Sequence, residues 1–288
     1  DEIDILVDLA GHAAHGALPV LARRPAPVQM MGLGYMATSG LPEVDAFLTD
    51  EACDPVGGAS EKYFTERLIR LPSQFVYVPR AGLPAAAGTP AKKRGHILFG
   101  VFNQYRKFTD DMLLLWREIL ERVPQAQLLL KSQIFFAPAM AEAARERLLQ
   151  IGFDPARVIL EPATTDYMER YLDVDLALDT YPWPGGGTTC DALYMGVPVV
   201  TMFGARRSTR FSYALLQHVG LESCAVQTPE DYVERAAALA GDLDGLDRMH
   251  RELRTRMERS AIMDQQGYMK ALERAYEDAL HRTDEERR

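Results

Sequence analysis

The amino-acid sequence predicts an α/β fold with two Rossmann-like domains that face a cleft. Short apolar runs rich in branched residues alternate with longer segments of helical period, as in βα units on a largely parallel sheet. The chain has 288 residues, which exceeds the usual size of one domain. A basic, proline-broken segment at residues 81–95 separates the two regions and is expected to be a linker that packs no element of its own.

The first region, residues 1–80, is expected to be a partial Rossmann-like domain. Strands are expected at 3–8, 27–31 and 45–49, and a looser apolar stretch follows from 68 to 79. The chain opens without a methionine and enters a strand almost at once. We therefore expect a fragment whose first domain is incomplete at its N-terminus.

The second region, residues 96–262, is expected to be a complete Rossmann-like domain because its βα rhythm is regular. Thr228 and Pro229 form a clear helix start, with a hydroxyl N-cap followed by proline at the first helical position. The charged tail should form two helices, of which the last, 263–288, packs back across the first domain. Expected strands lie at 97–102, 127–131, 157–161, 175–179 and 197–202, and expected helices at 110–123, 138–151, 165–172, 188–195, 208–219 and 229–240.

Composition argues against several functions. The formal net charge of -9 offers no broad basic surface to a nucleic acid. No apolar run reaches the length of a membrane-spanning helix, and the first residues are acidic where a signal peptide would be basic. The three cysteines are widely spaced and form no CxxC pair, which fits a reducing compartment. We therefore expect a cytoplasmic protein without nucleic-acid or membrane partners.

The most informative segment follows the expected strand that ends near Leu178. Three glycines, 185–187, let the backbone approach a bulky ligand, and the next helix offers free N–H groups and its positive dipole end to an anion. Thr188 and Thr189 can add hydroxyl donors, and Asp191 can accept from a ribose diol. The pattern fits a diphosphate site and, equally well, a glycine-rich turn with a threonine N-cap.

A second candidate segment ends the first strand of the second domain. Arg106 and Lys107 follow that strand, and ligands of open α/β sheets bind beyond the carboxyl ends of the strands. This turn and the glycine loop can therefore face one crevice, where Lys107 would neutralise phosphate. The alternative is that both are solvated loop cations, but their position at a strand end favours a ligand.

Five groups of residues occur in an order that is far more specific than a single glycine loop. They are residues 4–16, 23–29, 34–40, 102–104 and 186–201. Together they resemble the catalytic core of O-linked N-acetylglucosamine transferases, including bacterial relatives associated with tetratricopeptide repeats. The resemblance runs from residue 3 to about 275. It implies two domains of the glycosyltransferase-B type.

The resemblance also implies roles for individual residues. Lys107 would stabilise negative charge on the departing nucleoside diphosphate, and His12, at the end of the first strand, would face the cleft and orient acceptor or phosphate. The implied nucleotide-sugar contacts are Gln104 and the turn Gly186, Gly187, Thr188 and Thr189 for the diphosphate, Asp191 for the ribose, and Pro162, Ala163, Thr165 and Tyr167 near the uracil.

The implied reaction is inverting transfer of N-acetylglucosamine, or a related hexose, from a UDP-sugar to a serine or threonine hydroxyl of a protein. No metal or other cofactor is expected, because the helix terminus and Lys107 can replace a cation. Asp173 and Asp175 have the spacing of a cation-binding pair but lie at the entrance of a strand, where we expect them to be solvated.

The sequence departs from the family pattern at Met36, Ala37, Thr164, Tyr167 and Pro184, and it lacks the family's upstream histidine motif. These departures favour a rival interpretation, a degenerate module that binds a nucleotide or a protein without catalysis. A further alternative is transfer of glucose from UDP-glucose to asparagine. Helical repeats upstream would supply a groove for protein acceptors.

Overall fold

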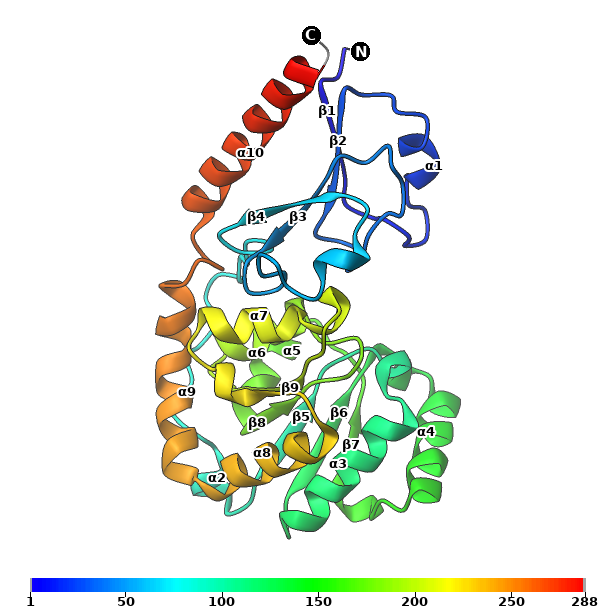
Figure 1. Ribbon diagram of the computed structural model, residues 1–288. Helices are drawn as coiled ribbons and strands as arrows, with labels where there is room; N and C mark the ends of the chain where they lie inside the picture. Colours follow the sequence, from blue (N-terminus) through cyan, green and yellow to red (C-terminus); the bar gives the residue numbers. More distant parts are fainter. Residues whose placement is uncertain (1, 287–288) are drawn as a thin grey trace.

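The chain folds into two regions, each built on a parallel β-sheet (Figure 1). A computed structural model describes residues 2–286. The first sheet has the order β1-β2-β3-β4 and the second has the order β10-β9-β8-β5-β6-β7. Every neighbouring pair is parallel. The α/β class predicted from the sequence is therefore confirmed.

The elements of the first region are β1 (Ile5–Asp8), α1 (Leu18–Leu21), β2 (Val28–Gly32), β3 (Ala46–Asp50) and β4 (Arg67–Leu71). After α2 (Ala91–Arg94), the strands of the second sheet are β5 (Leu98–Val101), β6 (Gln127–Lys131), β7 (Val158–Glu161), β8 (Leu176–Leu178), β9 (Val199–Met202) and β10 (Ala225–Val226). The longer helices are α3 (Asp110–Arg122), α4 (Pro138–Ile151), α6 (Gly187–Tyr194), α7 (Phe211–His218), α8 (Pro229–Gly241), α9 (Leu243–Glu258) and α10 (Gln265–Glu286), and α5 (Tyr167–Arg170) is a single turn.

The βα rhythm of the second region was predicted well, with small shifts at element ends. Strand β10 was missed because two residues are too few to show a strand pattern. Of the looser stretch at 68–79, the first part lies in β4, and the rest forms no strand. There the Tyr77 amide donates instead to the Ile262 carbonyl at 2.8 Å, which ties the chain leaving the first region to the chain returning to it.

The core of the second region follows the two-residue period of its strands. Phe99 and Val101 of β5 face a cluster with α3, α4 and α8, whereas Leu98 faces the opposite cluster with α6, α7 and α9. Both faces of the sheet are thus covered by helices, as expected for a parallel sheet. The carboxyl ends of its strands remain at one edge, where loops can meet a ligand.

The final helix, α10, returns to the first region and covers one face of its sheet (Figure 1). Ala275 and Ala279 are buried against Val28 and Met30 of β2. The opposite face packs Met31 and other apolar side chains. The packing of the last helix across the first region agrees with the expectation from the sequence.

Two expectations from the sequence were wrong, one about the linker and one about Asp175. Residues 81–95 contain the short helix α2 and pack against the second region, and Asp175 is fully buried rather than solvated. One Asp175 oxygen accepts from the Thr89 hydroxyl at 2.6 Å and the Ala91 amide at 2.7 Å, and the other pairs with Arg94. A buried carboxylate needs such partners, and the polar linker supplies them.

A buried arginine from the second region joins the two regions. Arg207 is 2% exposed, and its Nε lies 3.0 Å from Oδ2 of Asp54, which belongs to the first region and is fully buried. The guanidinium also donates to the Gln74 side-chain oxygen at 3.3 Å and lies over the Phe47 ring at 4.8 Å. Charge, hydrogen bonds and stacking therefore fix one relative position of the two regions.

A second arginine reinforces this interface through main-chain oxygens. Arg210 donates to the carbonyls of Cys53 at 2.7 Å and Ala52 at 3.0 Å. His218 of α7 lies 3.3 Å from the Asp50 carboxylate at the end of β3. The segment that follows β3 thus contacts the segment from Arg207 to His218 along its length.

Replacing Arg207 with leucine should destabilise the chain strongly, because the buried Asp54 carboxylate would lose its ion-pair partner. We expect the free energy of unfolding in urea to fall by about 3–5 kcal/mol, and the double variant Arg207→Leu, Asp54→Leu to recover much of this loss. The control Arg122→Leu removes two exposed ion pairs, with Glu118 and Glu234, and should cost less than about 1 kcal/mol. If Arg207→Leu and Arg122→Leu lowered the free energy of unfolding equally, the anchoring role of Arg207 would be contradicted.

Candidate active site

The two turns that the sequence predicted to share one crevice are in contact. Strands β5 and β8 are direct neighbours, so the turn after β5 and the glycine loop after β8 leave the sheet at the same edge. The Lys107 ammonium donates to the Pro184 carbonyl at 2.9 Å, which joins one turn to the other. The predicted juxtaposition therefore holds in the fold.

Lys107 is half-buried and held by two acceptors. Besides the Pro184 carbonyl, its ammonium donates to the Asn103 side-chain oxygen at 3.0 Å. Burial lowers the pKa of Lys107, neighbouring Arg106 lowers it further, and the Asp179 carboxylate opposes the decrease. The side chain thus offers a positive charge in a fixed position at the wall of the crevice.

Asp179 lies beneath both turns, and the sequence analysis gave it no role. It is 3% exposed, and its Oδ1 accepts from the amides of Thr180 and Gly185, both at 2.8 Å, and from the Asn103 Nδ2 at 3.2 Å. Its Oδ2 accepts from the Thr201 hydroxyl at 2.8 Å. Asp179 could have been recognised in the sequence as an aspartate that lies between an apolar strand and a glycine-rich loop.

The three glycines of the loop have different surroundings. A Cβ on Gly185 would collide with the side-chain oxygen of Thr189, and one on Gly186 would lie 2.7 Å from the Phe211 ring. A Cβ on Gly187, the first residue of α6, would meet no atom within 4 Å. The first two glycines therefore permit close packing, and the third leaves open space beside the N–H groups that begin the helix.

The two threonines that follow differ in burial and in their hydrogen-bond partners. Thr189 is buried, and its hydroxyl lies 2.8 Å from the Ser212 hydroxyl in the interior. Thr188 is half-buried, and its hydroxyl has no such partner among the hydrogen bonds of the described residues, although both threonines line a small cavity of about 20 Å³ with Asn103 and Asp179. Thr188 is therefore better placed for a ligand than Thr189.

Asp191, the predicted ribose contact, is held by two tyrosine hydroxyls. Tyr77 donates to one of its oxygens at 2.7 Å, and Tyr167 donates to the other at 2.8 Å. Burial raises the pKa of Asp191, while the two hydrogen bonds act in the opposite direction. Burial and the Asp191 charge raise the pKa of Tyr167 to about 12. Tyr77, which the sequence analysis did not select, thus connects the chain between the two regions to α6.

The predicted uracil contacts follow β7. Pro162 and Ala163 are half-buried and Thr165 is exposed. Lys131, at the end of β6, donates to the Pro162 carbonyl at 2.9 Å and so holds the start of this loop. Tyr167 then joins the loop to Asp191. Gln104, the predicted diphosphate contact, is exposed, and its carbonyl accepts from the Lys107 amide at 2.9 Å.

His12 and Lys107 line one cavity of about 810 Å³ between the two regions. His12 is exposed, its Nε2 lies 3.1 Å from the Ser39 carbonyl, and its ring lies 5.2 Å from that of Tyr35. The two candidate catalytic residues therefore line the same cleft, one from each region. The cavity is lined by Ala13, Ala14, Gly34, Tyr35 and Met36 on the His12 side and by Arg106, Trp183, Pro184 and Ser208 on the Lys107 side.

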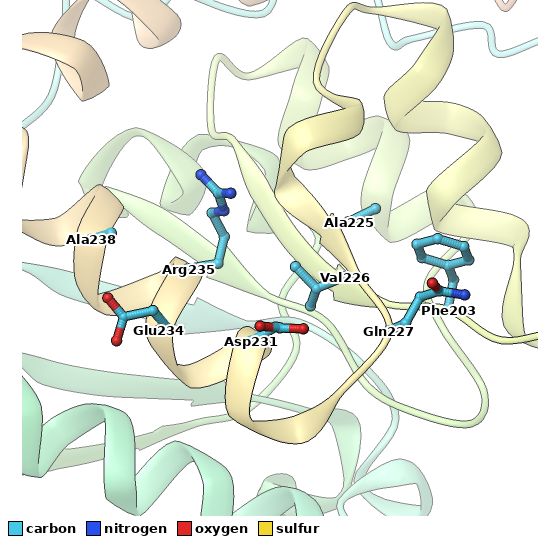
Figure 2. A pocket seen from close by; sticks show the side chains of 8 residues that line it. All are labelled: Phe203, Ala225, Val226, Gln227, Asp231, Glu234, Arg235 and Ala238. Atoms are coloured by element: carbon cyan, nitrogen blue, oxygen red, sulfur yellow. The ribbon is translucent and has the colours of Figure 1, made fainter.

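A separate surface hollow of about 530 Å³ lies beside β10 and α8 (Figure 2). It shares no lining residue with the cleft, and its charged lining side chains are Asp231, Glu234 and Arg235. Within residues 2–286, no group of three or more His, Cys, Asp or Glu side chains could hold a metal ion. No helix in the same part of the chain is long and apolar enough to cross a membrane.

Comparison with known sequences identifies relatives of the whole chain. Residues 1–81 and 89–272 match the profile of glycosyl transferase family 41. A protein from Solanum lycopersicum, named probable UDP-N-acetylglucosamine--peptide N-acetylglucosaminyltransferase SPINDLY, is 38% identical over 280 residues, which cover 96% of this chain and 30% of that protein. A second relative, from Arabidopsis thaliana, has the same description but is named SEC. It is 29% identical, and the match covers 96% of this chain and 29% of that protein. The chain thus spans about a third of these relatives.

Solved structures agree with this result. A variant of the O-GlcNAc transferase of Thermobaculum terrenum superposes with a TM-score of 0.89 at 33% identity, covering 99% of this chain and 54% of that chain. A pneumococcal O-GlcNAc transferase, GtfA, shares the fold with a TM-score of 0.57 at 11% identity, covering 98% of this chain and 58% of that chain. The resemblance inferred from the sequence motifs and the glycosyltransferase-B type of fold are confirmed. The chain belongs to glycosyl transferase family 41.

Proposed function

We propose that this chain carries the donor site of an inverting glycosyltransferase that moves N-acetylglucosamine from UDP-N-acetylglucosamine to a serine or threonine hydroxyl of a protein. One observation carries the proposal. The Lys107 ammonium donates to the Pro184 carbonyl, directly before the glycine loop that leads into α6, at the wall of a cavity between two Rossmann-like regions. The names of the family relatives support the donor and the acceptor class.

In the proposed reaction the acceptor oxygen attacks the anomeric carbon, the hydroxyl proton is released to solvent, and the bond from that carbon to the diphosphate oxygen breaks. Negative charge then develops on the departing UDP. Lys107 and the N–H groups that begin α6 lie where they would stabilise that charge. His12 would orient the acceptor or the phosphate from the opposite wall of the cavity, with Asp191 on the ribose and the loop after β7 beside the uracil.

We also propose that the reaction needs no metal ion. A cation normally neutralises the diphosphate of a nucleotide sugar. Here the positive end of α6 and the Lys107 ammonium supply charge at the same edge of the sheet. Binding of UDP in the presence of a chelator would support this part of the proposal, and binding that requires added Mg²⁺ or Mn²⁺ would contradict it.

The cysteines support a cytoplasmic location as a further part of the proposal. Cys53, Cys190 and Cys224 are all free and buried. Free thiols persist in reducing compartments and tend to oxidise elsewhere. The compartment can be tested by fusing the protein to a fluorescent protein, fractionating the cells and measuring the fluorescence of each fraction.

Calorimetric titration with UDP in a chelating buffer tests the donor site. Lys107→Ala should weaken binding by about 10- to 100-fold, because a hydrogen bond between charged groups is lost. Asp191→Asn should weaken it less, because the ribose is uncharged. The control Lys92→Ala removes an exposed cation that pairs with Asp244 and should leave the affinity unchanged. A folded sample that fails to bind UDP would contradict the donor site and favour a non-catalytic interaction module.

The glycine loop allows a second test, which separates folding from binding. Gly187→Ala adds a methyl group to open space, so the free energy of unfolding should stay the same or rise by up to about 1 kcal/mol. UDP affinity should nevertheless fall, because the methyl group occupies the space proposed for the diphosphate. Gly185→Ala should instead lower stability by about 1–3 kcal/mol through overpacking. Unchanged UDP affinity in Gly187→Ala would place the diphosphate elsewhere.

The sugar and the acceptor are tested by incubating the chain with a library of peptides and either UDP-N-acetylglucosamine or UDP-glucose. Mass spectrometry should detect addition of an N-acetylhexosamine to serine or threonine, and none with Lys107→Ala. Tyr167, which replaces the usual family histidine near the base, makes the comparison of donors informative. Hexose on asparagine would contradict the proposed reaction and support the glucosyltransferase alternative.

A further inference from the structure

Two buried aspartates border strand β8, one at each end. Asp175 precedes the strand and binds the linker, whereas Asp179 follows the strand at the edge where the candidate site lies. The two residues are of the same type and nearly equally buried, so a difference between their roles must come from their partners.

The partners of Asp179 connect the two turns of the site. Its Oδ1 accepts from the Gly185 amide in the glycine loop and from the Asn103 Nδ2 in the turn after β5. Because the Asn103 amide donates its hydrogens to Asp179, its oxygen faces Lys107 and accepts from the ammonium at 3.0 Å. The carboxylate therefore determines which end of the Asn103 amide meets the lysine.

Asp179 also influences Lys107 through its charge. The carboxylate is 3% exposed, so little water screens it. It raises the pKa of Lys107, while burial and Arg106 lower that pKa. His12 is a further titratable group lining the cavity. A negative charge at Asp179 thus favours the charged form of Lys107 in a half-buried position.

We propose that Asp179 is a positioning residue that holds Lys107 and the glycine loop in one arrangement for a nucleoside diphosphate. The diphosphate part rests on the proposed function. The positioning of Lys107 concerns this chain alone and can be measured without any nucleotide.

The substitution Asp179→Asn removes the negative charge of the side chain and keeps its size and shape. The asparagine oxygen can still accept from the Gly185 amide, and its NH₂ group can donate to the Thr201 hydroxyl, which can act as acceptor. Fold and stability should therefore largely persist. Asp175→Asn is a matched control at the other end of β8, where it loses the ion pair with Arg94 but no contact to the site.

The first measurement is the acylation rate of each lysine between pH 7 and 10, followed by peptide mass spectrometry without nucleotide. In Asp179→Asn the Lys107 profile should move to lower pH, with roughly tenfold faster labelling at a fixed pH below the pKa, because the nearby negative charge is gone. The exposed Lys62, far along the chain from both aspartates, serves as an internal reference in the same samples. The Lys107 profile should be unchanged in Asp175→Asn.

A Lys107 profile that does not move in Asp179→Asn, or that moves equally in both aspartate variants, would overturn the positioning role. The second measurement is UDP titration, in which Asp179→Asn should bind at least several-fold more weakly than Asp175→Asn. Equal affinities would overturn the diphosphate part of the inference. Absence of UDP binding by the unmodified chain would overturn that part too and would contradict the proposed function, while the labelling result would still decide the positioning of Lys107.

Discussion

The buried contact between Arg207 and Asp54 is the constraint on which the site depends. The cleft has one wall from each region, so its shape exists only while the regions keep one relative position. An ion pair with almost no solvent exposure, extended by Gln74 and the Phe47 ring, specifies such a position more strictly than apolar packing alone. The linker and the last helix add covalent connections, but they do not by themselves orient His12 toward Lys107.

The functional groups of the site are brought together mainly by the shared direction of the parallel strands. Parallel strands place their carboxyl ends at one edge, and the loops after β5, β7 and β8 all leave the sheet there. The start of α6 adds unpaired N–H groups and a positive dipole end to the same edge. Lys107 and the neighbouring Arg106 add positive side chains to this edge, close to the buried Asp179 carboxylate.

The sequence allowed the meeting of the two turns at one crevice to be anticipated, but not the side-chain partners within it. Lys107 and the glycine loop could be placed together because the period of the strands and the rule for strand ends require no knowledge of packing. Asp175 and Asp179 look alike in the sequence, and their burial is decided by donors that come from distant segments. Arg206, Arg207 and Arg210 are close neighbours, and only the three-dimensional contact selects Arg207 for the interior. Tyr77 reaches Asp191 across 114 residues, a pairing for which the sequence contains no local signal.

The return of α10 to the first sheet has a consequence for the order in which the chain acquires its structure. The second region draws its strands and covering helices from one continuous stretch and can condense as that stretch is synthesised. The first sheet precedes it in the chain, yet one of its faces is covered only when Ala275 and Ala279 arrive. Contacts between segments so far apart form slowly, because a long loop must close first. The wall of the cleft that holds His12 is therefore synthesised before the wall that holds Lys107 but is completed after it.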